Sequence, residues 1–370
     1  MCPSVEAQSV PVLDLSQDAV GVTRQLCDIE SVSGNEAAIA DAVVAALSGL
    51  PHLRITRDGD CVIARTELGR AERVIIAGHL DTVPVHGNLP SRLEPVDGEP
   101  FLWGRGSVDM KAGVAVQLRL ARELTNPPVD LTWMWYDHEE VGAELNGLGR
   151  AHRNHPELFA GDFAILGEPS NGRVEGGCNG SARVRLSTHG VRAHSARSWM
   201  GENAIEKLAP ILERLRTYEA ASVEVEGLVF REGLNAVSVT GGIAGNVIPD
   251  RASVEVNYRF APDKSPEEAL DLLRDLFPEA DDVEVTDLAG GARPGLDREL
   301  ARRFLDAVRL PVAAKLGWTD VARFSALGIP AVNFGPGDPA LAHTDDERVP
   351  VAQIEACEEA LRRWLSGDQS

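Results

Sequence analysis

The sequence predicts an α/β protein with a second, α+β domain inserted into it. Near both ends of the chain, short apolar runs rich in β-branched residues alternate with amphipathic segments, a pattern typical of a mixed sheet with helices on both faces. Between residues 182 and 290 the predicted order is strand, helix, strand, strand, helix, strand, which is that of the ferredoxin-like sandwich. The α/β pattern then resumes, so we expect one domain made of 1–181 and 291–370 around an inserted domain of 182–290.

The composition of the chain argues against several classes of function. The 370 residues carry a formal net charge of −21, which argues against nucleic acid or an anionic membrane as a partner. No apolar run is long enough to span a bilayer, and residues 1–6 lack the basic and apolar regions of a signal peptide. The five cysteines form no Cys-x-x-Cys pair, so the sequence indicates neither a disulfide framework nor a thiolate metal site. We therefore expect a protein of the reduced cytoplasm.

Periodicity assigns most elements in order along the chain. Ser33, in the turn between the first two helices, is suited to cap the second helix. Residues 85–101 are rich in proline and glycine and have little periodicity, so we expect a loop there. Helices are predicted at 17–30, 35–49, 111–125, 202–217, 265–276, 297–308 and 350–365. Strands are predicted at 53–56, 61–66, 131–136, 163–166, 183–189, 234–242, 253–260, 282–288 and 330–334.

One further strand, an apolar run that begins at Val74, ends in His79 and Asp81. Residues two apart in an extended chain point to the same side, so both side chains leave the strand end together, where open α/β sheets bind ligands. A metal-ligating histidine usually has its second ring nitrogen held by a carboxylate, and Asp81 could hold His79 in this way. The alternative is a polar surface turn, and these two residues alone do not distinguish the two.

Other ionisable residues also stand at the ends of predicted elements. Asp109 lies near the start of a helix, where a helix cap is the simpler explanation. Glu139 and Glu140 follow an apolar strand, and their burial would be costly without a cation, although a solvated acidic turn is the alternative. Glu168 follows the next strand and precedes a proline, as many turn residues do. His343 lies in the loop before the last helix.

We expect all of these residues to lie on one rim of the α/β core. A separate explanation for each residue does not account for this shared location. Two histidines with several carboxylates and no thiolate suit Zn²⁺ or Co²⁺, and Mn²⁺ is compatible. A carboxylate can bridge two metals, which then act on the attacking and the developing oxygen of a hydrolysis. Of two adjacent glutamates, one can bind metal while the other transfers protons. The sequence therefore predicts a metal-dependent amide or ester hydrolase.

These stretches resemble a known family, the dinuclear-zinc amidohydrolases and exopeptidases that include aminoacylase, carboxypeptidase G, acetylornithine deacetylase and succinyl-diaminopimelate desuccinylase. The matching segments follow the family's order over nearly the whole chain, at 78–84, 104–113, 139–142, 167–170 and 342–347. The resemblance implies a zinc-exopeptidase-like catalytic domain, with residues 182–290 as a lid and dimerisation domain. It also implies a cis peptide bond between Asp109 and Met110.

The same resemblance implies a metal site with two Zn²⁺ ions, of which Co²⁺ could replace one. One ion would be held by His79 and Glu168, and the other by Glu140 and His343. Asp109 would bridge the two ions.

Further roles are implied by the resemblance. Glu139 would be the general base, and Asp81 would orient His79. His194 would enter the active site of the partner subunit in a homodimer formed through the lid domain. Contacts with a small N-acyl amino-acid substrate would come from Asn246, Arg259, Thr319 and Arg323.

Within the family, segments 88–92, 175–180 and 241–250 resemble the desuccinylases of high-GC Gram-positive bacteria. These enzymes cleave N-succinyl-L,L-2,6-diaminopimelate on the route to lysine and peptidoglycan precursors. The motif at 343–347 is closer to the acetylornithine deacetylases, so that enzyme or a related N-acyl-amino-acid amidohydrolase or exopeptidase is the alternative. A metal-free binding or scaffold protein is a third hypothesis, against which the complete set of presumed ligands argues.

Overall fold

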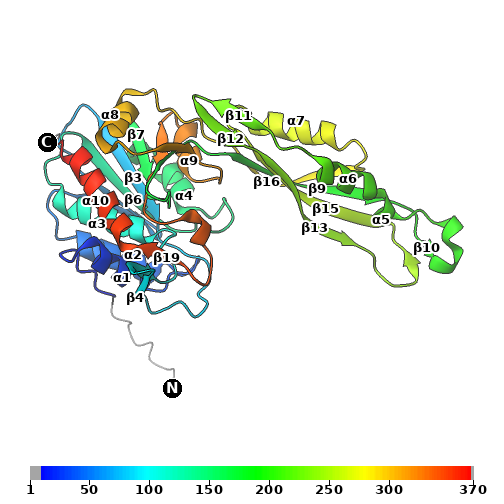
Figure 1. Cartoon of the computed structure of the whole chain (residues 1–370), viewed down its shortest axis with the longest axis horizontal. Coiled ribbons are helices and arrows are strands. Elements are labelled where there is room, and N and C mark those ends of the chain that lie inside the picture. Colours follow the sequence, from blue (N-terminus) through cyan, green and yellow to red (C-terminus); the bar gives the residue numbers. More distant parts are fainter. Residues whose placement is uncertain (1–9, 368–370) are drawn as a thin grey trace, which may run out of the picture. The chain divides into compact units, whose positions relative to one another are not determined.

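The computed structural model describes residues 10–367 (Figure 1). Cys2 and residues 1–6, for which the sequence predicts no signal peptide, lie outside the described residues. The chain forms two compact units. Within the described residues, the first unit combines residues 10–175, Gly295–Val312 and residues 327–367, and the second contains Gly176–Pro294 and Ala313–Ala326.

The first unit is built on a mixed sheet of eight strands, of which Gly176 and residues 313–314 are counted with the second unit. They are β1 (Arg54–Asp58), β2 (Cys61–Arg65), β3 (Arg73–His79), β6 (Asp130–Tyr136), β7 (Phe163–Leu166), β8 (Val174–Gly176), β17 (Val312–Ala314) and β18 (Ala331–Asn333). Their order in the sheet is β1-β2-β6-β3-β7-β18-β8-β17. β3 pairs parallel with β6 and β7, whereas β2 pairs antiparallel with β1 and β6. β6 is buried along its whole length, which explains its continuous apolar sequence.

Helices pack on both faces of this sheet, which confirms the predicted fold class. One group packs against alternate strand residues such as Val74, Ile76 and Trp133. This group comprises α1 (Ala19–Cys27), α2 (Ala37–Leu47), α3 (Lys111–Glu123), α8 (Glu299–Val308) and α10 (Val351–Ser366). On the other face, α4 (Gly147–Asn154), which the sequence analysis missed, contacts β1, β2 and β6 near Cys61. Shorter turns are η1 (Pro156–Phe159) and η3 (Pro339–Leu341). Among residues 10–367, no helix combines the length and apolar character needed to cross a membrane.

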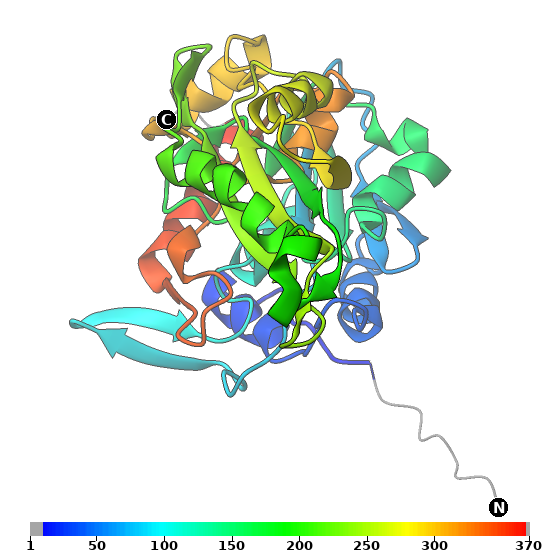
Figure 2. The same ribbon diagram turned by 90° about the vertical axis from the view of Figure 1, so that its right-hand side faces the viewer.

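The segment after β3 that was predicted as a loop contains a β-hairpin, so that prediction was wrong. β4 (Arg92–Val96) pairs antiparallel with β5 (Glu99–Trp103), and β5 also pairs with β19 (Arg348–Pro350). The connecting residues Asp97 and Gly98 have φ angles of 53° and 88°. Two-residue hairpin turns require this left-handed conformation and favour Asp-Gly. Prolines in both strands had obscured the alternation, and Figure 2 shows the hairpin in cyan, projecting from its unit.

The second unit is built on a four-stranded antiparallel sheet with the order β13-β15-β9-β16, which is that of a ferredoxin-like sandwich. The strands are β9 (Gly180–His189), β13 (Gly233–Gly241), β15 (Arg251–Phe260) and β16 (Asp282–Ala289). The helices are α5 (Ala204–Lys207), α6 (Ala209–Thr217), α7 (Pro266–Leu276), α9 (Val321–Ala326) and η2 (Ser195–Met200). Two short pairs, β10 (Ala193–His194) with β14 (Val247–Ile248) and β11 (Ser222–Val225) with β12 (Leu228–Arg231), complete it.

Residues 313–326 belong to the second unit, whereas the sequence analysis placed them in the other domain. The backbone carbonyl of Lys315 accepts a hydrogen bond from the N–H of Asn179 (3.3 Å). The indole of Trp318 donates to the carbonyl of Gly290 (3.1 Å). Such bonds between distant segments leave no trace in local periodicity, which is why the sequence did not indicate them.

Candidate metal centre

The central parallel strands of the first unit end at one edge of the sheet, and ionisable residues follow them. β3 ends at His79, which pairs in register with the last residue of β6. Glu139 and Glu140 come shortly after β6, and Glu168 comes shortly after β7. Because parallel strands carry their C-terminal ends to the same edge, the fold brings these side chains together.

His79 is fully buried, and each of its ring nitrogens has a different role. Nδ1 lies 2.9 Å from the backbone carbonyl of Asp81 and 3.4 Å from the Oδ1 of that residue. The backbone carbonyl is thus the nearer acceptor, where the sequence analysis had expected the carboxylate. Nε2 lies 3.0 Å from Asp109 Oδ1 and 4.0 Å from Glu168 Oε1, so the ligand atom of this ring faces two carboxylates.

Asp109 joins this group to a second one. Its Oδ2 lies 3.3 Å from His343 Nε2, which is itself 2.9 Å from Glu140 Oε1. The ligand atoms of His79, Asp109 and Glu168 lie within 4.8 Å of one another, as do those of Asp109, Glu140 and His343. Asp109 caps no helix, since α3 begins after Met110, and the Asp109–Met110 bond is cis, as the resemblance implied. One carboxylate therefore presents one oxygen to each group.

Asp81 is buried and holds the adjacent glutamates by their backbone. Its Oδ1 accepts the N–H of Glu139 (3.0 Å), and its Oδ2 accepts the N–H of Glu140 (3.1 Å). Ser33 also donates to Oδ2 (2.6 Å) and does not cap α2, which begins after Glu36 without a side-chain cap. Burial alone would raise the pKa of Asp81, but its hydrogen bonds, first among them that from His79, lower the pKa to about 2. Asp81 is therefore ionised and holds the backbone of Glu139 and Glu140 in place.

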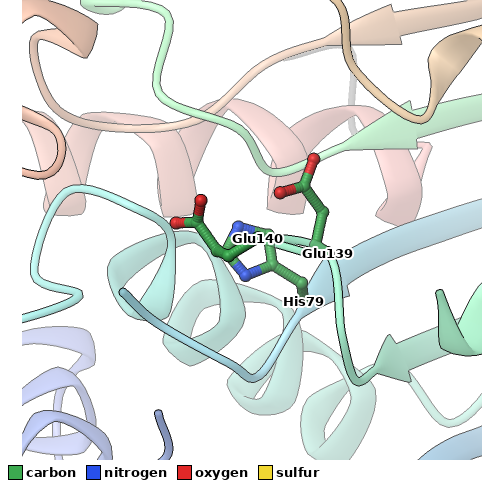
Figure 3. A group of neighbouring side chains, drawn as sticks. All are labelled: His79, Glu139 and Glu140. Carbon is green, nitrogen blue, oxygen red and sulfur yellow. The ribbon is translucent and has the colours of Figure 1, made fainter. Parts of the chain in front are cut away.

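The two glutamates flank the imidazole of His79 in Figure 3. One ligand atom from each of His79, Glu139 and Glu140 lies within 4.8 Å of the others, which makes a third candidate group. His138, just before them, has a φ of 58°, and its Nδ1 lies 2.8 Å from the carboxylate of Asp137. This bond fixes the residue where the chain turns out of β6.

Charge pairing dominates the electrostatics of the cluster. Hydrogen bonds to Asp109 and Glu140 raise the pKa of His343 to about 10. Burial would lower the pKa of His79, but hydrogen bonds to Asp109 and Asp81 raise it well above its usual value. Burial would raise the pKa of Asp109, yet the two imidazoles bring it below its usual value. The carboxylates outnumber the imidazoles, so the cluster attracts cations.

The donor set fits divalent cations. All ligand atoms are imidazole nitrogens or carboxylate oxygens, which suits Zn²⁺, Co²⁺ or Mn²⁺. The sharing of Asp109 suits a pair of cations bridged by one carboxylate. The described cysteines belong to none of these groups and are buried, which raises the pKa of each thiol; they are Cys27, Cys61, Cys178 and Cys357.

The model of peptidase family M20/M25/M40 matches residues 75–367 of the chain. The chain belongs to this family. A Corynebacterium glutamicum protein named succinyl-diaminopimelate desuccinylase is 48% identical over 366 residues, covering 96% of this chain and 98% of its own length. A Mycobacterium tuberculosis H37Rv protein, provisionally named succinyl-diaminopimelate desuccinylase DapE, is 54% identical over 358 residues, covering 96% of this chain and 100% of its own.

Solved structures share the fold of this M20 family member. The aminopeptidase PepT of Bacillus cereus superposes with a TM-score of 0.75 at 19% identity, covering 96% of this chain and 98% of its own. The YXEP protein of Bacillus subtilis, described as a dinuclear metal-binding peptidase of the M20 family, has a TM-score of 0.69 at 14% identity, with coverages of 94% and 96%. The predicted class, a metal-dependent amide hydrolase of this family, is confirmed.

Two of the remaining predicted residues of this M20 family member, His194 and Asn246, lie in adjoining segments of the second unit. His194 ends β10 and is exposed, and its Nδ1 accepts the backbone N–H of Ala196 (3.0 Å). In the neutral ring the proton is then assigned to Nε2, which makes that nitrogen a hydrogen-bond donor. The backbone carbonyl of Asn246 accepts the N–H of Ser195 (2.9 Å).

The other predicted substrate contacts also belong to the second unit. Arg259 is half-buried in β15, and its Nε donates to Asn257 (3.1 Å). Thr319 is buried. Arg323 pairs with the buried carboxylate of Asp320, so its charge is already balanced within the unit.

Arg105 and Glu347 had no predicted role, yet both are buried in the first unit and form an ion pair with an Nη1–Oε2 distance of 2.7 Å. Glu347 also accepts the backbone N–H of Asp109 (3.1 Å), so the pair adjoins the candidate ligands. The only signal in the sequence was that each residue lies in a motif that matches the family.

The raised pKa of His343 predicts how the stability of the metal-free protein depends on pH. The imidazole titrates near 6.5 when unfolded and near 10 when folded, so its stabilisation is complete below about 6.5 and is lost as the pH rises through about 10. His343→Gln removes this contribution. The difference in unfolding free energy between wild type and variant, measured by urea denaturation with a chelator present, should shrink across this range. A constant difference would contradict the pairing of His343 with Asp109 and Glu140.

Proposed function

We propose that this chain hydrolyses N-succinyl-L,L-2,6-diaminopimelate to succinate and L,L-diaminopimelate, a precursor of lysine and peptidoglycan. The observation that carries the proposal is the 48% identity, over nearly the full length of both chains, to the desuccinylase of Corynebacterium glutamicum. The candidate metal groups around Asp109 are consistent with hydrolysis of an amide. We place the reaction in the cytoplasm, because the described cysteines are unpaired thiols.

We assign one cation to His79 and Glu168 and the other to Glu140 and His343, with Asp109 shared between them. Nitrogen and oxygen donors of this kind suit Zn²⁺ at both positions, with Co²⁺ able to replace one. When bound, such a pair of cations lowers the pKa of a water molecule and polarises the amide carbonyl.

Glu139 is the proposed general base. Its backbone N–H is fixed by Asp81, and its carboxylate lies in the same candidate group as His79. Glu139 takes a proton from the attacking water and returns it to the departing amine, so the C–N bond breaks to give a free amine and a carboxylate. His194 is the proposed donor to the developing oxyanion, through Nε2–H. A well-placed donor of this kind is typically worth ~3 kcal/mol.

Recognition of the substrate needs local positive charge. The substrate carries three carboxylates, whereas the chain has a net charge of −21. We propose Arg259 as the main cationic contact, because Arg323 is already paired with Asp320. Asn246 and Thr319 are proposed as further polar contacts.

A substrate panel on metal-loaded and metal-depleted protein tests the proposed function. N-succinyl-L,L-diaminopimelate should be cleaved with a higher kcat/KM than N-acetylornithine or a dipeptide. Dialysis against a chelator should abolish turnover, and titration with Zn²⁺ should restore it at two equivalents, counted by elemental analysis. A preference for N-acetylornithine would favour the deacetylase alternative. Full turnover in metal-free protein would overturn the metal assignment.

The adjacent glutamates should respond differently to substitution. Glu139→Gln should keep both cations and lose at least ~10²-fold in kcat, because it removes proton transfer. Glu140→Gln should weaken one cation site as well, because it replaces a ligand oxygen. Metal content and single-turnover rates measure the two effects separately. If Glu139→Gln emptied a site while Glu140→Gln kept both, the two roles would be reversed.

We further propose a two-fold dimer in which His194 completes the site of the partner subunit. Glu139→Gln lacks the base and keeps His194, while His194→Ala lacks the donor and keeps Glu139. In a mixed dimer, the site with an intact Glu139 would receive its histidine from the other chain. Refolding a mixture of the two variants should restore roughly a quarter of wild-type activity, since half of the dimers are mixed and each has one complete site.

Mass spectrometry should confirm that mixed dimers form, and each variant refolded alone is the control. If His194 acts within its own chain, both sites of every mixed dimer remain defective. No gain over the separate variants would then refute the trans arrangement.

A further inference from the structure

The buried ion pair of Arg105 and Glu347 has no part in the proposed function as stated so far. Arg105 is 3% exposed and Glu347 is 1% exposed. Removing both charges from water costs free energy that their mutual attraction recovers only in part. The role of the pair therefore depends on the other groups that it contacts.

Glu347 accepts four backbone N–H groups from one short segment. Its Oε2 accepts the N–H of Gly106 (3.0 Å), and its Oε1 accepts those of Val108 (3.0 Å) and Asp109 (3.1 Å). Its own backbone carbonyl accepts the N–H of Gly104 (3.1 Å). One residue thus fixes the backbone that leads into Asp109.

Arg105 connects this segment to two others that carry candidate ligands. Its Nε donates to the carbonyl of Pro84 (3.1 Å), in the stretch that follows His79. Its Nη1 donates to the carbonyl of Thr344 (3.1 Å), the residue after His343. The three segments that hold His79, His343 and the bridging carboxylate therefore meet at one guanidinium.

We propose that the pair of Arg105 and Glu347 positions the Asp109 carboxylate between His79 and His343 and so sets the spacing of the two cation positions. The inference rests on the proposed function. Asp109 presents Oδ1 to His79 and Oδ2 to His343, so a rotation of its backbone would disturb both groups at once. Glu347 is a positioning residue, because it acts through backbone N–H groups.

Glu347→Gln is the most direct test. Both carboxylate oxygens accept N–H groups, so an amide in either orientation places an NH₂ group against donors. Zn²⁺ should bind about 10- to 100-fold more weakly, as is typical when a group that orients ligands is lost. The Co²⁺-substituted variant should also show an altered visible absorption spectrum, because the coordination of the cations changes.

Asp130→Asn is the matched control. Asp130 is a buried carboxylate that accepts the backbone N–H groups of Leu68 and Arg70, each at 2.8 Å. It starts β6, at the opposite end of that strand from the metal cluster. Asp130→Asn should lower the melting temperature and leave Zn²⁺ affinity and the Co²⁺ spectrum as in wild type, because it removes the same kind of bonds elsewhere.

Calorimetric titration of metal-free proteins with Zn²⁺, with melting temperatures measured in parallel, separates the outcomes. Wild-type affinity and a wild-type spectrum in Glu347→Gln would overturn the inference. If that variant does not fold, Arg105→Lys takes its place, since a lysine keeps the charge but lacks the separate Nε and Nη1 donors that reach Pro84 and Thr344. Unchanged Zn²⁺ affinity in that variant would also overturn the inference. Failure of wild type to bind Zn²⁺ would instead overturn the proposed function.

Discussion

The burial of negative charge at the ends of parallel strands is the constraint on which the rest of the site depends. β3, β6 and β7 deliver a histidine and three glutamates to one edge, and Asp109 adds a further carboxylate. Carboxylates withdrawn from water stay ionised only when cations or hydrogen-bond donors compensate them. Here the two imidazoles partly balance the carboxylates, which lowers the pKa of Asp109 and raises that of His343. The excess of negative charge is what favours divalent cations.

Two buried carboxylates, at different places in the first unit, each fix the backbone of a segment of the site. Asp81 accepts the N–H groups of Glu139 and Glu140, and Glu347 accepts that of Asp109 and of residues just before it. In each case a carboxylate holds the backbone at or beside residues that we assign to the cations or to proton transfer, and their side chains face the site. Binding a cation then requires little ordering of the backbone, which would otherwise cost about 1–2 kcal/mol per residue. The precision of the site therefore depends on residues that need not touch the cations.

Local sequence predicted the long buried strands and the ionisable residues that follow them, because periodicity and strand direction are enough to place both. It failed where the decisive interaction joins distant segments. Arg105 and Glu347 are separated by 242 positions, and nothing in the spacing of either residue indicates the pair. The bond from Ser33 to Asp81 was missed because a serine before a helix fits a cap equally well. The β4–β5 hairpin did carry a signal, the Asp97-Gly98 turn, but its prolines argued for a loop.

Our proposal assigns chemistry and specificity to different units of the chain. Every residue that we assign to the cations and to proton transfer within one subunit comes from the first unit, whereas the proposed substrate contacts and His194 come from the second. A pair of cations held as proposed would suit the hydrolysis of many amides, so it does not determine which acyl group is cleaved. On this assignment, the desuccinylase and deacetylase alternatives differ at the proposed substrate contacts, such as Arg259, and not at the proposed metal ligands.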